Sequence, residues 1–332
     1  MTKGAVAAAP AGAKRAEFRK RETCLLCESK NLEVIWVSSF GDRTVRQEIE
    51  SAHYAGDPLA ALQDIPFRRM QCQDCGMTFQ GDILTEDWLK VLYGEWISSE
   101  QIEAVESALA RSPLFVAQQN AKHCLRIAQM LGVEATPKRP PRILDFGCGD
   151  GSFLRSASLF GFDAVGIDFS DSRQQRNRRA GPVSLYSNLT DVQESLADGS
   201  LAGGERFDAI TLFQVLEHVA EPLETLQALS NCIRPGGILV VEVPNCKGVG
   251  HRPESMEDHG KVDPLEHINH FTPSSLSLMC QRAGFAPVTY GAAFATTRLQ
   301  EVLKALAGSL IRHSPLGPLR QNTNQYFRKG GR

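Results

Sequence analysis

The chain has 332 residues, of which 42% are hydrophobic and 22% are charged, as is usual for a soluble globular protein. This length allows one large α/β domain and a smaller module. The net charge of −2 argues against a broad electrostatic contact with nucleic acid. No apolar run approaches the length of a membrane span. We therefore expect a globular protein without a transmembrane helix or a broad nucleic-acid surface.

The first 20 residues are rich in alanine and then in basic residues, with Lys14, Arg15, Arg19 and Lys20. They lack a continuous apolar stretch that ends at a cleavage site, so they predict a disordered tail over 1–20 rather than a secretory signal. Composition leaves an organellar transit peptide open. Nine cysteines without a signal indicate a reducing compartment, and the expected location is cytoplasmic.

Two C-x-x-C pairs predict a zinc-binding module over residues 21–84. They are Cys24-Leu-Leu-Cys27 and Cys72-Gln-Asp-Cys75, and such pairs supply four thiolates for a tetrahedral Zn²⁺ site. Four protein ligands leave no open position, so the predicted role of the ion is structural. Gly76 follows the second pair, whereas Glu28 stands where a glycine is more usual. Buried or free thiols, or a redox pair, are the alternatives.

A helical pattern follows, and we assign 85–136 to a helical linker or lid. It begins at a plausible cap, Thr85, and residues 100–131 have the spacing of one or two amphipathic helices. Proline residues near 137–141 mark the boundary of the next domain, which we place at 137–311.

The 137–311 segment alternates between strands and helices. Strands are predicted at 142–146, 163–168, 184–187, 207–213 and 237–243, and helices at 152–160, 170–180 and 222–233. This alternation predicts an α/β fold with a doubly wound, Rossmann-like parallel sheet covered on both faces. A helix at 273–283, short strands at 287–290 and 295–298, a helix at 299–311 and a flexible basic tail at 312–332 complete the prediction.

A glycine-rich turn follows the first of these strands. Asp145 stands near the end of the strand, and Gly147, Gly149 and Gly151 follow at alternate positions. Glycine lets the backbone turn tightly and lets a ligand approach closely. Asp168 ends the next apolar run, about 20 residues on, where a carboxylate can accept the two hydroxyls of a ribose. The two features predict a nucleoside pocket.

The D-x-G-x-G-x-G order of this turn resembles motif I of class I S-adenosylmethionine-dependent methyltransferases. A dinucleotide fingerprint needs glycine or alanine where this chain has Ser152, so an NAD-dependent oxidoreductase is a distant alternative. Segments 206–219, 234–237 and 266–285 resemble later parts of the same family in order and spacing. The resemblance covers about 141–285.

The resemblance implies S-adenosyl-L-methionine as the cofactor and a set of residues that bind it. Phe213 and Gln214 follow the fourth strand, beside the methionine end of the cofactor in such proteins. Ser187 and Asn188 are candidates for contact with adenine. The predicted cofactor-binding residues are Asp145, Gly147, Cys148, Gly149, Gly151, Asp168, Phe169, Asn188, Phe213 and Gln214.

The zinc module joined to this core resembles sugar C-methyltransferases of deoxysugar pathways and shorter relatives associated with surface-polysaccharide biosynthesis. The long sugar enzymes have a further C-terminal domain, whereas only about 45 residues follow Phe285 here. The resemblance therefore favours the shorter relatives. It implies a small polar acceptor such as a sugar nucleotide or glycan precursor, and it does not specify whether oxygen, nitrogen or carbon is methylated.

Methyl transfer to a hydroxyl or a carbon acid needs a base, and a neutral histidine suits this task near pH 7. His267 and His270 are the leading candidates, with Glu266 able to orient one of them, and His218 is the second choice. These histidines can equally fix a turn or pack in the core. Glu266, His267 and His270 can also be interpreted as a metal site.

A polar loop precedes these residues and contains His251, His259 and Asp263, which belong to an acceptor lid or are simply solvated. Two rival functions remain at this point. One is a binding or scaffold protein built on the zinc module, and the other is a methyltransferase that acts on RNA or protein. The sequence does not determine the oligomeric state.

Overall fold

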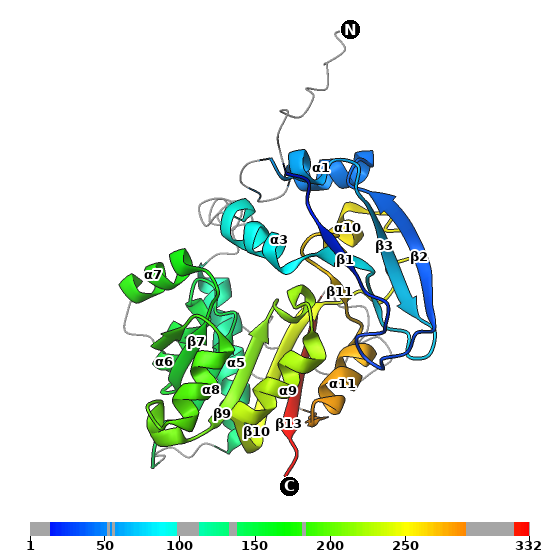
Figure 1. Cartoon of the computed structure of the whole chain (residues 1–332). Helices are drawn as coiled ribbons and strands as arrows, with labels where there is room; N and C mark the ends of the chain where they lie inside the picture. The colour runs from blue at the N-terminus through cyan, green and yellow to red at the C-terminus, as the bar shows by residue number, and fades with distance from the viewer. Residues whose placement is uncertain are drawn as a thin grey trace.

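The computed structural model describes residues 14–51, 54, 57–97, 113–132, 138–180, 184–289 and 322–331. A small N-terminal module lies over one end of a larger α/β domain (Figure 1). That end is the one at which the parallel strands of the large sheet finish. Among the described residues, no helix is both long enough and apolar enough to cross a membrane.

The large domain is built on a seven-stranded sheet. In spatial order its strands are β12 (Phe285–Pro287), β13 (Asn322–Lys329), β10 (Ile233–Pro244), β9 (Phe207–Phe213), β6 (Arg142–Phe146), β7 (Asp163–Ile167) and β8 (Ser184–Tyr186). The strands from β10 to β8 are parallel, and β13 runs antiparallel to both of its neighbours. The five predicted strands of the doubly wound sheet are thus found, but the sheet is mixed rather than parallel.

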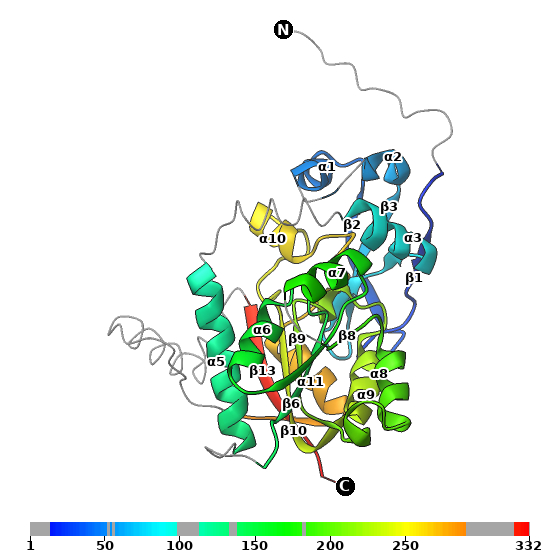
Figure 2. The ribbon, with the colours of Figure 1, turned by 90° about the vertical axis from the view of Figure 1, so that its left-hand side faces the viewer.

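Helices cover both faces of this sheet, and a buried apolar cluster lies under each layer. One layer contains α5 (Pro113–Leu131) and α6 (Ser152–Leu159), and the opposite layer contains α8 (Leu189–Ala197), α9 (Pro222–Cys232) and α11 (Pro273–Arg282) (Figure 2). Strand side chains alternate between the layers: Ile143 joins the first cluster and Leu144 the second. Helix α7 (Asp171–Ala180) follows β7.

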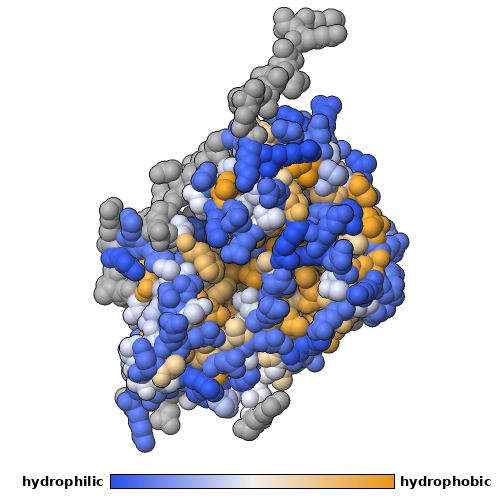
Figure 3. All heavy atoms as spheres, viewed as in Figure 1, coloured by the Kyte–Doolittle hydropathy of each residue, from blue (hydrophilic) through white to orange (hydrophobic). Residues whose placement is uncertain are grey.

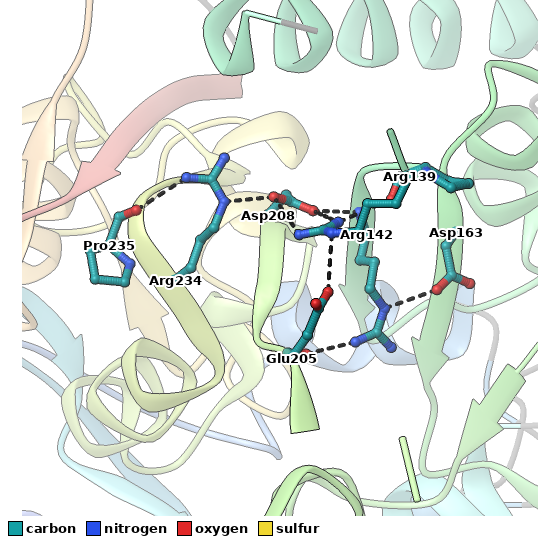
Figure 4. A network of polar contacts seen from close by, with 8 residues as sticks. Arg139, Arg142, Asp163, Glu205, Asp208, Arg234 and Pro235 are labelled. Carbon is teal, nitrogen blue, oxygen red and sulfur yellow. Dashed lines mark hydrogen bonds and ion pairs between the residues drawn. The ribbon is translucent and has the colours of Figure 1, made fainter. Parts of the chain in front are cut away.

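The amino ends of the parallel strands are held by a network of charged side chains (Figure 4). Asp208 accepts hydrogen bonds from Arg139 at 2.7 Å, from Arg234 at 2.6 Å and from the backbone of Arg142 at 2.7 Å. Burial opposes ionisation of Asp208, but the hydrogen bonds prevail and lower the pKa of its carboxyl group below the usual value. The network ties β6, β9 and β10 together.

The N-terminal module contains a four-stranded antiparallel sheet. Its order is β11 (Asn269–His270), β4 (Thr78–Gln80), β3 (Pro66–Cys72) and β2 (Leu32–Ser39). A separate pair joins β1 (Phe18–Lys20) to β5 (Asp82–Leu84). Strand β11 comes from the large domain, so a segment far along the chain completes the sheet of the module.

Short helices surround this sheet. They are α1 (Arg43–Ser51), α2 (Pro58–Leu62), α3 (Glu86–Val91), the π-helical turn η1 (Leu92–Trp96) and α10 (Met256–Lys261). Two 3₁₀ turns, η2 (Ala202–Gly204) and η3 (Leu216–His218), lie in the large domain. The core of the module is aromatic, with Phe40, Phe67, Trp88 and Trp96 among its buried side chains.

The structure corrects three predictions about the ends and boundaries of the chain. Phe18–Lys20, which were predicted to be part of a disordered tail, form β1 and pair with β5. The predicted C-terminal tail contains β13, where Tyr326 and Phe327 are buried on opposite faces of the sheet. Basic residues around this apolar pair concealed the strand. The first of the two predicted short strands lies at Phe285–Pro287 rather than 287–290.

Other predicted segments lie wholly or partly outside the described residues. These are the strand at 295–298, the helix at 299–311 and parts of the 85–136 linker, of which α3, η1 and α5 are described. Helix α8, by contrast, was missed in the sequence. Asn188 caps it by accepting a hydrogen bond from the backbone of Asp191 at 2.9 Å.

Candidate active site

The glycine turn after β6 has the conformation that its sequence requires. Gly147, Gly149 and Gly151 all have positive φ angles, of 78°, 53° and 73°. A Cβ atom at Gly147 would lie 2.5 Å from Val215 Cγ2, whereas one at Gly149 would meet nothing within 4 Å. The first glycine is therefore needed for packing, and the second opens onto space that a ligand can enter.

Asp168 lies beside this turn and fixes it. The Asp168 carboxylate accepts hydrogen bonds from the backbone of Gly149 at 2.8 Å and from that of Ser170 at 2.9 Å. It is 4% exposed, and burial raises the pKa of its carboxyl group, an effect opposed by these hydrogen bonds and by Arg173 at 3.8 Å. Each carboxylate oxygen retains a lone pair, so Asp168 can also receive hydroxyls of a ribose.

The aromatic and polar residues next to Asp168 fall into two groups. Phe169 is 64% exposed and meets Phe146 edge to face, with ring centroids 6.0 Å apart, so it offers a free ring face beside the turn. Asn188 is occupied in capping α8, and Ser187 accepts a hydrogen bond from Gln174 at 3.2 Å. Phe169 is the better placed of these residues to contact a nucleobase.

Asp145 and Cys148 are buried beneath the turn. The Thr211 hydroxyl donates a hydrogen bond to Asp145 at 2.6 Å, but burial prevails and raises the pKa of Asp145 to about 7. Burial also raises the pKa of the Cys148 thiol. Both residues support the turn from within.

The segment after β9 is conformationally unusual. Gln214 has a φ of 55°, in a region that residues other than glycine seldom occupy, and its amide donates to Glu242 at 3.2 Å. Such strain clusters at functional sites. Phe213 packs between His123 and Phe153, with centroids 4.8 and 4.9 Å away. Of the two residues predicted to form the wall of the pocket, Phe213 is thus part of the core and Gln214 lies in a strained loop.

A group of titratable side chains follows Gln214. Glu217 and His218 lie on η3, and the ring of His267 meets that of His218 edge to face at 4.9 Å. One ligand atom of each of the three residues lies within 4.8 Å of the others. Glu217 is 1% exposed, and neither of its carboxyl oxygens has a hydrogen-bond partner among the described residues. Burial, with the carboxyls of Glu242 and Glu266, raises the pKa of Glu217 to about 8.

The N-terminal module contributes to this group. The Tyr54 hydroxyl donates a 2.6 Å hydrogen bond to Glu266, and the Asp263 carboxylate accepts one from the backbone of Glu266 at 2.9 Å. Tyr93 is 39% exposed. Burial of its hydroxyl, together with the nearby carboxyl groups of Glu266 and Glu217, raises the pKa of Tyr93. Because Val215, the residue before η3, packs against Gly147, the group adjoins the glycine turn.

His270 does not join this group. It lies in β11, is fully buried, and receives a hydrogen bond from Arg69 at 3.3 Å. Burial, with the charge of Arg69, lowers its pKa far below the usual value. His270 is enclosed in the sheet of the module, apart from Glu217, His218 and His267, so its role as a base stays a prediction that its burial disfavours. His259 pairs with Glu48 at 3.3 Å, and His251 is exposed.

The sequence prediction missed Glu217 and both tyrosines. Glu217 adjoins His218 in a segment already identified as important, so a carboxyl group next to a candidate base was a readable signal, although its burial was not. Tyr54 is separated from Glu266 by 212 positions, and no local pattern links them.

The hollow between the module and the large domain has an apolar floor on the face shown in Figure 3.

The four predicted cysteine ligands come together in the module. Cys24 Sγ lies 3.5 Å from Cys75 Sγ, Cys27 Sγ lies 3.5 Å from Cys72 Sγ, and all four sulfurs lie within 4.8 Å of one another. Tetrahedral Zn–S bonds of about 2.3 Å place sulfurs at comparable separations. Burial raises the pKa of the Cys75 thiol to about 11, whereas burial of Cys72 is outweighed by hydrogen bonds from the turn and from neighbouring cysteines, which lower its pKa.

The glycine turn after the first parallel strand and the carboxylate after the second define a Rossmann-like enzyme that binds a nucleoside. Comparison with known proteins makes this class specific. Residues 115–290, more than half of the chain, match the family described as a methyltransferase domain. The chain therefore belongs to this family of methyltransferase domains.

Curated relatives include the ubiquinone biosynthesis O-methyltransferase of Dinoroseobacter shibae, which is 30% identical over 162 residues, or 46% of this chain and 62% of the relative. The protein with the same name from Cereibacter sphaeroides strain ATCC 17025 is 35% identical over 165 residues, or 44% of this chain and 61% of the relative. The chain thus spans about three fifths of the length of these relatives.

Solved structures with detectable similarity include an S-adenosylmethionine-dependent methyltransferase of Archaeoglobus fulgidus. It is 18% identical, with a TM-score of 0.46, over 69% of this chain and 99% of that one. The amino pentose methyltransferase of calicheamicin biosynthesis from Micromonospora echinaspora is 24% identical, with a TM-score of 0.33, over 42% of this chain and 54% of that one.

Proposed function

We propose that this methyltransferase acts on a small polar acceptor, of the sugar-nucleotide or glycan-precursor class, bound between the module and the large domain. One observation carries the proposal: the hydroxyl of Tyr54, from the module, bonds to Glu266, whose backbone carbonyl oxygen lies 2.9 Å from His218 Nδ1 in the large domain. The resulting site joins a nucleoside-binding region to side chains that can accept a proton.

Each part of the site has a task in methyl transfer. When bound, S-adenosylmethionine supplies a methyl group that its sulfonium already activates. The backbone at Gly149 and the carboxylate of Asp168 would hold the cofactor, with Phe169 against its base. The group of Glu217, His218 and His267 would take the proton that a hydroxyl or carbon acid loses. Orientation and exclusion of water can contribute several kcal/mol, and proton transfer roughly 10²–10⁴ in rate.

The cofactor half of the proposal is tested by calorimetric titration with S-adenosylmethionine. We expect micromolar binding that is lost in Asp168→Ala. Asp163→Ala is the matched control, because Asp163 begins β7 and Asp168 follows its other end. Absence of binding in the wild type, or equal binding in Asp168→Ala, would remove the proposed pocket.

The acceptor half is tested by transfer of labelled methyl to separate pools of sugar nucleotides, phenols, RNA and protein. A labelled sugar nucleotide is the expected product. A labelled phenol would favour a second acceptor class, which the names of the curated relatives suggest. Labelled RNA or protein would replace the small acceptor with a macromolecule. No product from any pool, together with weak cofactor binding, would favour a scaffold.

The zinc ion is proposed as a structural part of the module. We expect one zinc per chain in metal analysis and its loss in Cys72→Ser, with a lower temperature of unfolding. Cys232→Ser is the matched control, because Cys232 is equally buried but lies on α9, away from the four-cysteine group. Retention of zinc in Cys72→Ser would contradict the assignment. The cytoplasmic location stays a prediction from cysteine usage.

A further inference from the structure

Glu217, His218 and His267 bring one carboxyl group and two imidazoles together, and no lysine or arginine among the described residues forms an ion pair with Glu217. His218 Nε2 lies 3.9 Å from a carboxyl oxygen of Glu217, and the ligand atoms of all three residues are mutually within 4.8 Å. Glu217 is almost fully buried and has no hydrogen-bond partner among the described residues. An ionised carboxylate in such a place is unfavourable unless a cation joins it.

The hydrogen bonding of His218 determines which of its nitrogens faces Glu217. His218 Nδ1 lies 2.9 Å from the backbone carbonyl oxygen of Glu266, which can only accept, so Nδ1 carries the proton. In the neutral ring, Nε2 then presents a lone pair toward Glu217. A backbone carbonyl on the far nitrogen is also the usual partner of a histidine that ligates a metal.

His267 presents a third acceptor from a different segment. Its Nδ1 is buried without a hydrogen-bond partner among the described residues, and its ring contacts that of His218. The carboxyls of Asp263 and Glu266 lie nearby and add negative potential. Lone pairs from two histidines and one carboxylate thus gather at one place in an acidic setting.

We propose that Glu217, His218 and His267 bind a divalent first-row metal ion. Two histidines and one carboxylate form a ligand set that leaves coordination positions open. Open positions suit an acceptor that chelates through neighbouring oxygens. With the three side chains on the ion, the ion would lower the pKa of a bound hydroxyl, in place of direct proton transfer to these side chains. This role rests on the proposed function, whereas binding of the ion does not.

The ion also distinguishes this site from the four cysteines. Thiolates select zinc, whereas imidazole and carboxylate ligands accept Mn²⁺ as well. Manganese can therefore be added to protein that keeps its zinc, and it reports on Glu217, His218 and His267 alone. It is also paramagnetic, so free and bound ions are separated by electron paramagnetic resonance.

The test is a titration of the zinc-loaded full chain with MnCl₂, followed by electron paramagnetic resonance. We expect one bound Mn²⁺ per chain, with affinity reduced at least about tenfold in Glu217→Gln and in His267→Gln. Glu205→Gln and His251→Gln are matched controls on exposed positions and should bind as the wild type does. Circular dichroism confirms that each variant is folded.

No Mn²⁺ bound to the wild type, or equal affinity in folded Glu217→Gln and His267→Gln, would overturn the proposal and leave Glu217 as a protonated acid. The calorimetric titration with S-adenosylmethionine separates this failure from failure of the proposed function. Cofactor binding without Mn²⁺ binding removes the metal site alone. Mn²⁺ binding without cofactor binding keeps the metal site and removes the methyl-transfer role.

Discussion

The two ends of the large sheet hold buried carboxyl groups in opposite electrostatic settings. At the amino ends, Asp208 is surrounded by Arg139, Arg234 and a backbone donor, and its pKa is lowered. At the carboxyl ends, burial raises the pKa of Asp145 to about 7 and that of Glu217 to about 8. The first setting stabilises the fold, whereas the second costs stability and is typical of a functional site.

The largest expected difference between the two ends of the sheet is in enzymatic activity. Glu217→Gln should lower kcat for methyl transfer by about 10²–10⁴, because the site loses its buried carboxylate. The free energy of unfolding should stay the same or rise, since an unpartnered carboxyl is removed. Initial rates and thermal unfolding measure the two effects. Glu205→Gln, at the amino ends of the strands, is the control, and full activity in Glu217→Gln would break the contrast.

Asp145 should make stability fall as pH rises. Its folded pKa of about 7 lies above the usual 3.8, so the folded state holds a proton that the unfolded state has released between these values. Stability therefore declines through this window and levels off above pH 7. The cost is about 3–5 kcal/mol across the full window. In Asp145→Asn the free energy of unfolding, measured with urea from pH 5 to 7.5, should fall much less; equal slopes would contradict the raised pKa.

Asp208 should affect stability without affecting the cofactor site. Asp208→Ala is expected to lower the free energy of unfolding by about 3 kcal/mol, because it leaves the backbone donor of Arg142 and two guanidinium groups without their acceptor. Chemical denaturation measures this change, and calorimetry should find unchanged affinity for S-adenosylmethionine in the folded variant. A loss of affinity as large as the loss of stability would show that the two ends are coupled.

Two positions in the N-terminal module, away from both ends of the large sheet, should show how large a purely local change in stability is. Glu28 follows the first cysteine pair with a φ of 62°, and Gly76 follows the second with a φ of 74°. Glu28→Gly should raise the free energy of unfolding by about 0.5 kcal/mol, less any contribution of its exposed ion pair with Arg282. Gly76→Ala should lower it by about 1 kcal/mol. Changes of opposite sign would contradict the assignment of strain.

Local patterns predicted much of the large domain. The strands at β6, β7, β8 and β9 agree with their predicted ranges to within a residue, and so do helices α6, α7 and α9, whereas α8 was missed. These segments combine strong hydrophobic runs with glycine or proline at their ends, so the local sequence determines their secondary structure. Strand β13 was missed because only its pairing with β10 and β12 makes it a strand.

The positions of the proposed catalytic residues were harder to predict than those of the proposed cofactor-binding residues. Gly149 and Asp168 follow adjacent strands of one sheet, so sequence spacing alone brings them together, at 2.8 Å. His267 and His270 are three positions apart on one loop, yet one lies in the site and the other is enclosed by the module. Periodicity cannot separate these outcomes, because they depend on contacts with β4 and Arg69.

The sequence by itself determined the order of strands and helices in the large domain, the glycine turn, the carboxylate after β7 and the pairing of cysteines into two knuckles. All of these depend on neighbouring residues or on the regular geometry of a parallel sheet. Only the tertiary structure decided that Tyr54 meets Glu266, that β11 completes the module and that Glu217 loses access to water. Those features depend on burial between segments far apart in the chain, and burial determines both the charge of a carboxyl group and what it can bind.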